Sequence, residues 1–136
     1  MSASLRPAVM AFAALVLGIC AGEWAADVFA QDAAQTVTQQ LVDDRFVPAE
    51  LRFRSGVLYR LHLENRGREM HEFTAPEFLK SADVKNPEIL VRDGTDVVLQ
   101  PGEVKDILLV PRRAGHFKLI CADHDWAGMV GEIVVE

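Results

Sequence analysis

The C-terminal end of the chain constrains the fold most, because it places three candidate metal ligands in one short loop. Cys121, His124 and Met129 form the pattern C-x-x-H-x-x-x-x-M between two apolar runs that are typical of β-strands. A thiolate, an imidazole and a weak thioether are donors that suit copper, whereas a structural zinc site recruits four strong nitrogen or sulfur donors. The loop still lacks one imidazole, so we expect a second histidine to reach it from elsewhere in the chain.

Three further histidines are candidates for this ligand, namely His62, His71 and His116. Apolar and polar residues alternate around His62, which predicts a strand with this histidine on its solvated face. The same alternation in the run that leads to Cys121 places His116 on the opposite face from the cysteine. His62 and His116 are therefore weak candidates.

Most of the remaining chain consists of short apolar runs separated by glycine, proline, asparagine and aspartate, with little helical periodicity. Seven or eight short strands at this spacing predict an all-β domain, an antiparallel two-sheet sandwich with Greek-key connections. One helical turn is compatible with residues 75–80. The expected strands span residues 36–42, 57–65, 88–92, 96–99, 104–110, 116–121 and 131–136, with a turn-to-strand passage over 46–53.

Residues 1–30 have the pattern of a signal peptide. A positive start at Arg6 precedes an apolar run over 8–22, and a small-x-small site ends at Ala30. We expect cleavage after Ala30, which leaves residues 31–136 as one periplasmic domain that does not span the membrane. An uncleaved anchor is disfavoured because the run is shorter than the roughly 20 residues that a bilayer crossing needs. A lipoprotein with Cys20 as the lipidated residue is a weaker alternative.

Export determines how the cysteine and the charge are interpreted. The mature chain keeps Cys121 alone and can form no internal disulfide, so a bound metal would explain an odd thiol in an oxidising compartment. Loss of Arg6, Glu23 and Asp27 with the leader leaves thirteen basic and eighteen acidic residues, a net charge of −5. An acidic domain argues against nucleic acid as a partner.

The chain resembles the cupredoxin family, the small type 1 (blue) copper proteins such as plastocyanin, pseudoazurin and amicyanin. The matching motifs are Gly115-x-Phe117-x-Leu119-x-Cys121, Gly128-Met129-Val130-Gly131, Ile133-Val134-Val135 and, upstream, Phe46-x-Pro48 and Asn65-x-Gly67. The resemblance covers most of residues 45–136 and implies one bound copper ion that changes between Cu(I) and Cu(II). It also implies His71 as the remote ligand, together with Cys121, His124 and Met129.

The implied ligand set also limits the chemistry. Met70 adjoins His71, but neighbouring residues on extended backbone point to opposite sides, so the loop methionine is the better axial ligand. Four such ligands leave no open position for water or substrate, which excludes hydrolytic metal chemistry. One-electron transfer remains, with Cys121 as the conduit and His124 as the exit nearest the surface. In the family the residue after the remote histidine often donates a backbone hydrogen bond to the sulfur, and here that residue is Glu72.

Four carboxylates flank the two histidines of this ligand set, and they are Glu69, Glu72, Asp123 and Asp125. They are either ordinary solvated acids or a site that attracts a cation. The cation would be the basic rim of a cytochrome-like redox partner or ferrous iron, which suits carboxylate oxygens.

The motif His71-Glu72-Phe73 also resembles the small cupredoxin-like components that accompany bacterial iron-permease uptake systems. That resemblance implies oxidation of ferrous iron before import, with an iron-permease component as redox partner. One copper takes one electron, so the chain would have to pass the electron on. It would then be an electron carrier rather than a stand-alone enzyme.

Two other classes of function stay open. A periplasmic copper carrier or buffer would exchange the metal itself, but such proteins favour several exposed methionines, and the mature chain keeps only Met70 and Met129. A metal-free sandwich that acts as a binding module is compatible with the fold class alone.

Overall fold

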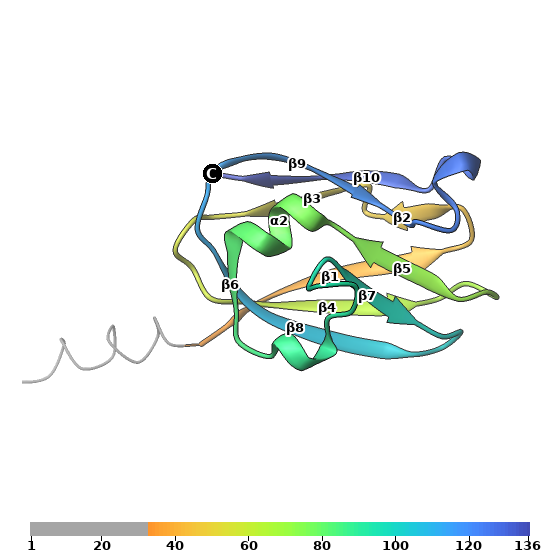
Figure 1. The fold of residues 1–136 in the computed structure, drawn as a ribbon, viewed down its shortest axis with the longest axis horizontal. Coiled ribbons are helices and arrows are strands. Elements are labelled where there is room, and N and C mark those ends of the chain that lie inside the picture. Colours follow the sequence, from red (N-terminus) through yellow and green to blue (C-terminus); the bar gives the residue numbers. More distant parts are fainter. Residues whose placement is uncertain (1–32) are drawn as a thin grey trace, which may run out of the picture. The chain divides into compact units, whose positions relative to one another are not determined.

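The computed structural model describes residues 33–136, which form a sandwich of two five-stranded β-sheets (Figure 1). The predicted all-β two-sheet sandwich is confirmed. The predicted signal peptide and Cys20 lie outside the described residues. Within residues 33–136, no helix combines the length and the hydropathy that a membrane crossing requires.

The first sheet has the strand order β2-β1-β4-β8-β6. Its strands are β1 (Gln35–Val42), β2 (Arg45–Val47), β4 (Tyr59–Asn65), β6 (Ala82–Val84) and β8 (Val104–Pro111). β4 pairs antiparallel with β8 and parallel with β1. The parallel pair arises because the chain crosses to the other sheet after β2 and returns to lie beside β1.

The second sheet has the strand order β3-β10-β9-β5-β7. Its strands are β3 (Glu50–Phe53), β5 (His71–Thr74), β7 (Asp96–Leu99), β9 (Gly115–Ile120) and β10 (Val130–Val135). β10 pairs antiparallel with β9 and parallel with β3. Pairing is therefore antiparallel, as predicted, except in the β1–β4 and β3–β10 pairs, because strand direction follows from the connections and not from local residue patterns.

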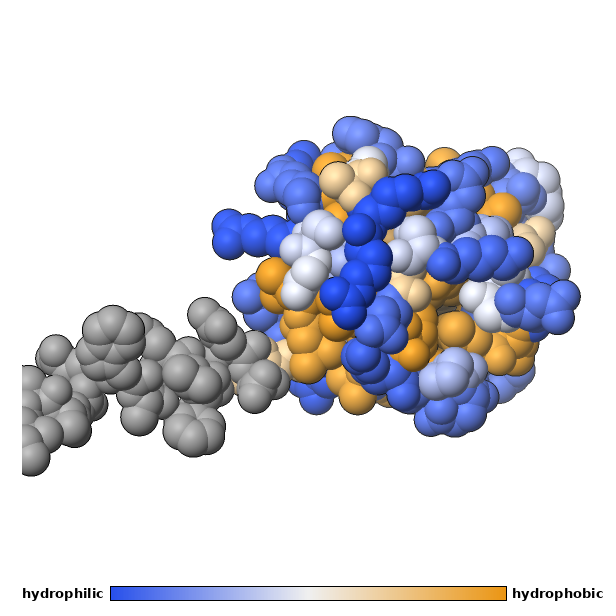
Figure 2. Space-filling model, turned by 60° about the vertical axis from the view of Figure 1, so that its left-hand side comes forward, coloured by the Kyte–Doolittle hydropathy of each residue, from blue (hydrophilic) through white to orange (hydrophobic). Residues whose placement is uncertain are grey.

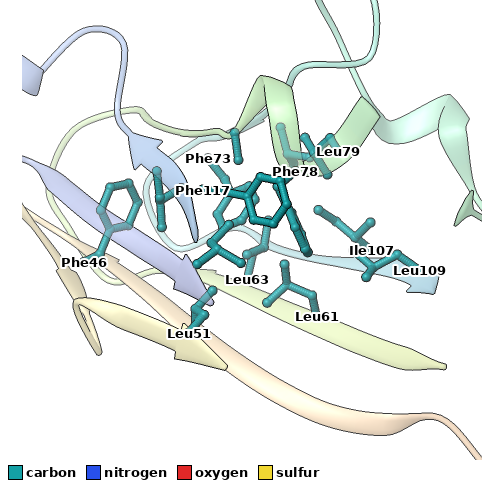
Figure 3. Close-up of a cluster of buried hydrophobic side chains, with 14 of the residues drawn as sticks. Phe46, Leu51, Leu61, Leu63, Phe73, Phe78, Leu79, Ile107, Leu109 and Phe117 are labelled. Atoms are coloured by element: carbon teal, nitrogen blue, oxygen red, sulfur yellow. The ribbon is translucent and has the colours of Figure 1, made fainter. Parts of the chain in front are cut away.

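The alternation read from the sequence decides which side chains enter the core. In β4, Tyr59, Leu61 and Leu63 are buried, whereas His62 lies on the outer face and is only partly covered. Figure 3 shows side chains from both sheets and from the helix α2 packed together between the layers. The labelled members of this cluster are Phe46, Leu51, Leu61, Leu63, Phe73, Phe78, Leu79, Ile107, Leu109 and Phe117.

The helical turn expected over residues 75–80 is present as α2 (Pro76–Ser81), which buries Phe78 and Leu79. The strand expected over residues 88–92 is wrong. A 3-10 turn, η1 (Pro87–Ile89), stands in its place, followed by Arg92 in a left-handed backbone conformation with φ 50°. Proline at the start of η1 donates no backbone hydrogen bond to a sheet, and a positive φ ends extended structure.

The surface is mainly hydrophilic on the face shown in Figure 2, with hydrophobic residues visible between the polar ones. Among residues 33–136, the large hydrophobic side chains with substantial exposure are Val47, Val91, Val104, Trp126 and Val130. Trp126 is the most exposed of them, at 83%.

Three connections lie at the end of the sandwich opposite to the C-terminus in Figure 1, and this end carries the candidate site. They are the β1–β2 turn, the β4–β5 loop and the β9–β10 loop. Side-chain hydrogen bonds join them, since Asp43 of the first binds Arg68 of the second, and Glu69 of the second binds His124 of the third.

Candidate metal centre

Cys121 is placed by the end of β9. Phe117 and Leu119 point into the core, so the period of two brings Cys121 to the same buried face. Its backbone N–H donates to the carbonyl oxygen of Met129 at 3.1 Å, which closes the loop onto the start of β10. The thiol is fully buried and is the one free cysteine of the described residues.

The loop between β9 and β10 is folded around His124. Its backbone N–H donates to the Cys121 carbonyl at 3.1 Å, and its carbonyl accepts from the backbone N–H of Met129 at 3.2 Å. A 3-10 turn, η2 (Asp125–Ala127), follows and ends at Gly128 with φ 96°, a conformation that favours glycine. The loop therefore turns back on itself and brings a buried methionine beside the cysteine.

His71 opens β5 and is almost fully buried. Its Nδ1 lies 3.9 Å from Sγ of Cys121, and Nδ1 of His124 lies 3.3 Å from the same sulfur. One donor atom from each of these three residues lies within 4.8 Å of the others. Residues 50 positions apart in the sequence thus converge on one point.

The two histidines disfavoured by the sequence lie elsewhere. His62 contacts Asp106 at 2.6 Å and Glu64 at 3.2 Å on the outer face of the first sheet. His116 contacts Glu132 at 2.7 Å on an exposed face. Neither belongs to the cluster of His71, Cys121 and His124 in the described part of the chain.

Each imidazole of the cluster has a carboxylate on its second ring nitrogen. Nε2 of His71 lies 3.4 Å from Oδ1 of Asp43, and Nε2 of His124 lies 3.1 Å from Oε2 of Glu69. An Nε2–H that donates to a carboxylate leaves the Nδ1 lone pair free on the side of the sulfur. Both rings therefore present the atom that a metal needs.

Asp43 is itself fixed by its neighbours, and the sequence interpretation did not include it. Oδ1 accepts from the Arg68 backbone N–H at 2.8 Å and Oδ2 from Arg68 Nε at 2.9 Å. These bonds to Arg68 lower the pKa of Asp43 from 3.8 to about 2, so the carboxylate is ionised at neutral pH. Asp43 and His71 are 28 positions apart, and no local pattern connects them.

The four predicted acids are not gathered in one place. Glu69 touches His124 and is 71% exposed, and Asp123 and Asp125 are exposed on the β9–β10 loop. The side chain of Glu72 lies on the opposite face of β5 from His71 and Phe73, is 1% exposed and binds Arg92. Its carboxylate therefore does not reach the surface beside His124.

The backbone of Glu72 has the role expected for it, because its N–H lies 3.3 Å from Sγ of Cys121. Burial raises the pKa of the Cys121 thiol, backbone hydrogen bonds from Glu72, Asp123 and His124 lower it, and the Glu72 charge raises it again. Metal binding by this thiol therefore releases a proton.

The donor set fits copper. A buried sulfur, two imidazoles with their Nδ1 atoms toward it and a fully buried methionine at the end of the same loop are soft and intermediate donors. They come from β5, from the end of β9 and from the loop between β9 and β10. No hard, all-oxygen cage of the kind that magnesium or calcium prefers is part of this arrangement.

Comparison with protein families matches residues 9–135 to the cupredoxin-like domain. The chain belongs to the cupredoxin-like family. The family and the donor set together imply one copper ion, and His71, Cys121, His124 and Met129 are arranged as a type 1 copper site would require.

Solved structures agree with this cupredoxin-like fold. Auracyanin B is 21% identical, with a TM-score of 0.59 over 76% of this chain and 89% of that one. Dithionite-reduced auracyanin from the photosynthetic bacterium Roseiflexus castenholzii is 16% identical, with a TM-score of 0.58 over 76% of this chain and 98% of that one. Comparison with curated proteins found no match.

Replacing Asp43 with asparagine is expected to weaken copper binding. The change removes the negative charge of the carboxylate next to Nε2 of His71 and the ion pair with Arg68. Loss of such a partner to a ligand typically lowers metal affinity about 10–100-fold. Competition with a Cu(I) chelator measures the effect. Asp44→Asn is the matched control, because Asp44 makes no side-chain hydrogen bond within residues 33–136. Equal affinities of both variants would contradict this role of Asp43.

Proposed function

We propose that this cupredoxin-like protein is an exported, periplasmic one-electron carrier whose copper is held by His71, Cys121, His124 and Met129. In this proposal residues 1–30 are removed and the mature chain starts at Gln31. The observation that carries the ligand assignment is the convergence of a buried thiol and two imidazoles within 4.8 Å, from two distant segments of a closed β-sandwich.

A copper ion in this site would supply a change of oxidation state by one electron, with no open position for substrate. The protein's part is to keep the donors still. Cys121 is held by the end of β9, and His71 by the start of β5 and by Asp43. Donors that need not move add little reorganisation to an electron transfer. Of the three clustered ligands His124 is the most exposed, at 16%, so its ring is the shortest route to the surface.

The test separates an electron carrier from a copper exchanger. Mature protein mixed with Cu(II) is expected to turn blue with one copper per chain, and to bleach and recolour reversibly with a reductant and an oxidant. A carrier keeps its copper against a chelator through these cycles. Rapid loss of the metal to the chelator in either state would favour the copper buffer, and a colourless protein would contradict both.

The surface around His124 supports a protein partner with a basic rim. Trp126, on the same loop as His124, and Val130, at the start of β10, are exposed, and the loop also carries the exposed Asp123 and Asp125. An apolar contact surrounded by negative charge suits a positively charged redox protein, whose association slows as salt screens the attraction.

A finer proposal is that ferrous iron is one electron donor, as part of iron uptake. Glu69, Asp123 and Asp125 would attract the cation, and Glu69 already touches Nε2 of His124. One electron would leave Fe²⁺, giving Fe³⁺, and enter the site through His124. Glu72 is left out of this cation site because its carboxylate is buried against Arg92. The electron would then pass to an iron-permease component or a cytochrome-like protein.

Fe²⁺ is expected to bleach the blue protein, and Glu69→Gln and Asp123→Asn to slow this bleaching several-fold. Stopped-flow absorbance measures the rates. Glu77→Gln, an exposed glutamate on α2, is the matched control. Bleaching by an uncharged reductant should be unchanged in Asp123→Asn and Glu77→Gln. Equal Fe²⁺ rates for wild type and both variants would remove the iron proposal and leave the electron carrier intact.

A further inference from the structure

Two buried carboxylates next to the candidate metal centre both contact the guanidinium of one arginine. Glu72 of β5 and Asp96 of β7 are each 1% exposed, and they lie on neighbouring strands of the second sheet. Nη2 of Arg92 binds Oε1 of Glu72, and Nη1 of Arg92 lies 3.4 Å from Oδ2 of Asp96. We call these three residues the Arg92 cluster.

The turn that precedes β7 fixes the position of Arg92. Arg92 and Asp93 both have positive φ, 50° and 58°, which non-glycine residues adopt only when their surroundings impose it. The surroundings here are hydrogen bonds within the turn. Thr95 Oγ1 donates to the Arg92 carbonyl at 2.8 Å, and the backbone N–H of Val91 donates to the Asp96 carbonyl at 2.9 Å.

The charges of the Arg92 cluster do not balance. Two carboxylates face one guanidinium, so the cluster carries one net negative charge when all three groups are ionised. Glu72 Oε2 and Asp96 Oδ1 are buried and have no hydrogen-bond partner within the described residues. Burying such groups costs stability that apolar residues of similar size would not cost. A role in holding the sheet together therefore does not account for them.

The location of Glu72 suggests what the charge does. Its backbone N–H is the one that lies 3.3 Å from Sγ of Cys121, so the buried carboxylate belongs to a residue in direct contact with the sulfur. Charges act strongly across a buried, poorly polarisable medium. A negative charge there favours the higher of two positive charges at the metal, and so opposes reduction.

We propose that Arg92 pairs with the buried carboxylate of Glu72, whose backbone N–H contacts Cys121, and that the net negative charge of the Arg92 cluster lowers the reduction potential of the copper site. The predicted effect on the reduction potential rests on the proposed copper function. The role of Arg92 in holding two buried carboxylates is independent of any metal.

The first experiment measures the reduction potential of the copper-loaded protein by redox titration. Glu72→Gln keeps the backbone N–H and removes the charge, and it is expected to raise the potential. Asp96→Asn removes the other buried charge without altering the residue beside the sulfur, and the shift should have the same sign. Glu136→Gln, an exposed glutamate bound to Arg52, is the control and should leave the potential unchanged. An unchanged potential in both buried variants would overturn the proposal.

The second experiment measures urea unfolding of the metal-free protein. Arg92→Gln in the wild type leaves two buried charges unpaired, and is expected to lower the folding equilibrium constant about a hundredfold or more. In a protein that already carries Glu72→Gln and Asp96→Asn, Arg92→Gln should lower the folding equilibrium constant by less than about tenfold. Equal losses in both backgrounds would overturn the role of Arg92. A protein that binds no copper would refute the proposed function, and this second experiment would still decide whether Arg92 holds the buried charges.

Discussion

Replacing Cys121 with serine is expected to abolish the blue colour of the copper-loaded protein and most of its copper affinity. The sulfur is the strongest soft donor of the site, and both imidazole Nδ1 atoms lie within 3.9 Å of it. A serine hydroxyl keeps nearly the same shape but is a hard, neutral donor. Visible absorption and copper content after gel filtration measure the loss.

The matched controls for this variant are His62→Asn and His116→Asn. Both histidines lie outside the candidate centre, on the outer faces of the two sheets. We expect them to keep the colour and one copper per chain. A Cys121→Ser protein with unchanged copper content would show that the metal binds elsewhere, and the ligand assignment would then be wrong.

Replacing Gly67 with alanine is expected to be the second most damaging change. A Cβ at this position would lie 2.5 Å from Oδ1 of Asp43 and 2.6 Å from Nε2 of His71, distances that real contacts do not reach. The carboxylate and the ring therefore both have to move. Because the movement displaces a ligand and not only its outer partner, the loss of copper affinity should exceed the roughly 100-fold upper range for outer changes.

Competition with a chelator measures this loss, and circular dichroism of the metal-free protein shows whether the fold is kept. Arg66→Ala is the control in the same loop, because the Arg66 side chain is exposed and binds only Glu64 among the described residues. Adding Asp43→Ala to Gly67→Ala should not restore affinity, since the contact with the His71 ring remains. Wild-type affinity in Gly67→Ala would mean that His71 is not a ligand.

The strands and the faces of their side chains were predictable because they depend on residues close together in the sequence. Alternation placed Leu61 and Leu63 in the core and Cys121 on the same face as Leu119. It also set His62 and His116 aside correctly. Where local chemistry opposed alternation the prediction failed, since proline at position 87 and a positive φ at Arg92 replaced an expected strand.

The acids around the site were predicted less well, because their environment depends on strand packing. The sequence predicts that acids adjacent to a ligand in the chain also lie near the metal centre, and this holds for Glu69, which contacts His124. On extended backbone successive side chains alternate, so Glu72 points away from the face that carries His71 and is buried against Arg92, 20 residues away. Asp43 is not predictable from the sequence, because its contact with His71 joins two segments that no sequence pattern relates.

The sequence by itself determined the donor types, the loop that carries three of them and the β-sandwich with its buried faces. These follow from local spacing and from a period of two. Only the tertiary structure decided which carboxylate holds each imidazole, where Glu72 points and which strand pairs are parallel. Those contacts depend on the register and connection of segments that lie 20 to 82 residues apart, and a residue pattern within one strand carries no information about them.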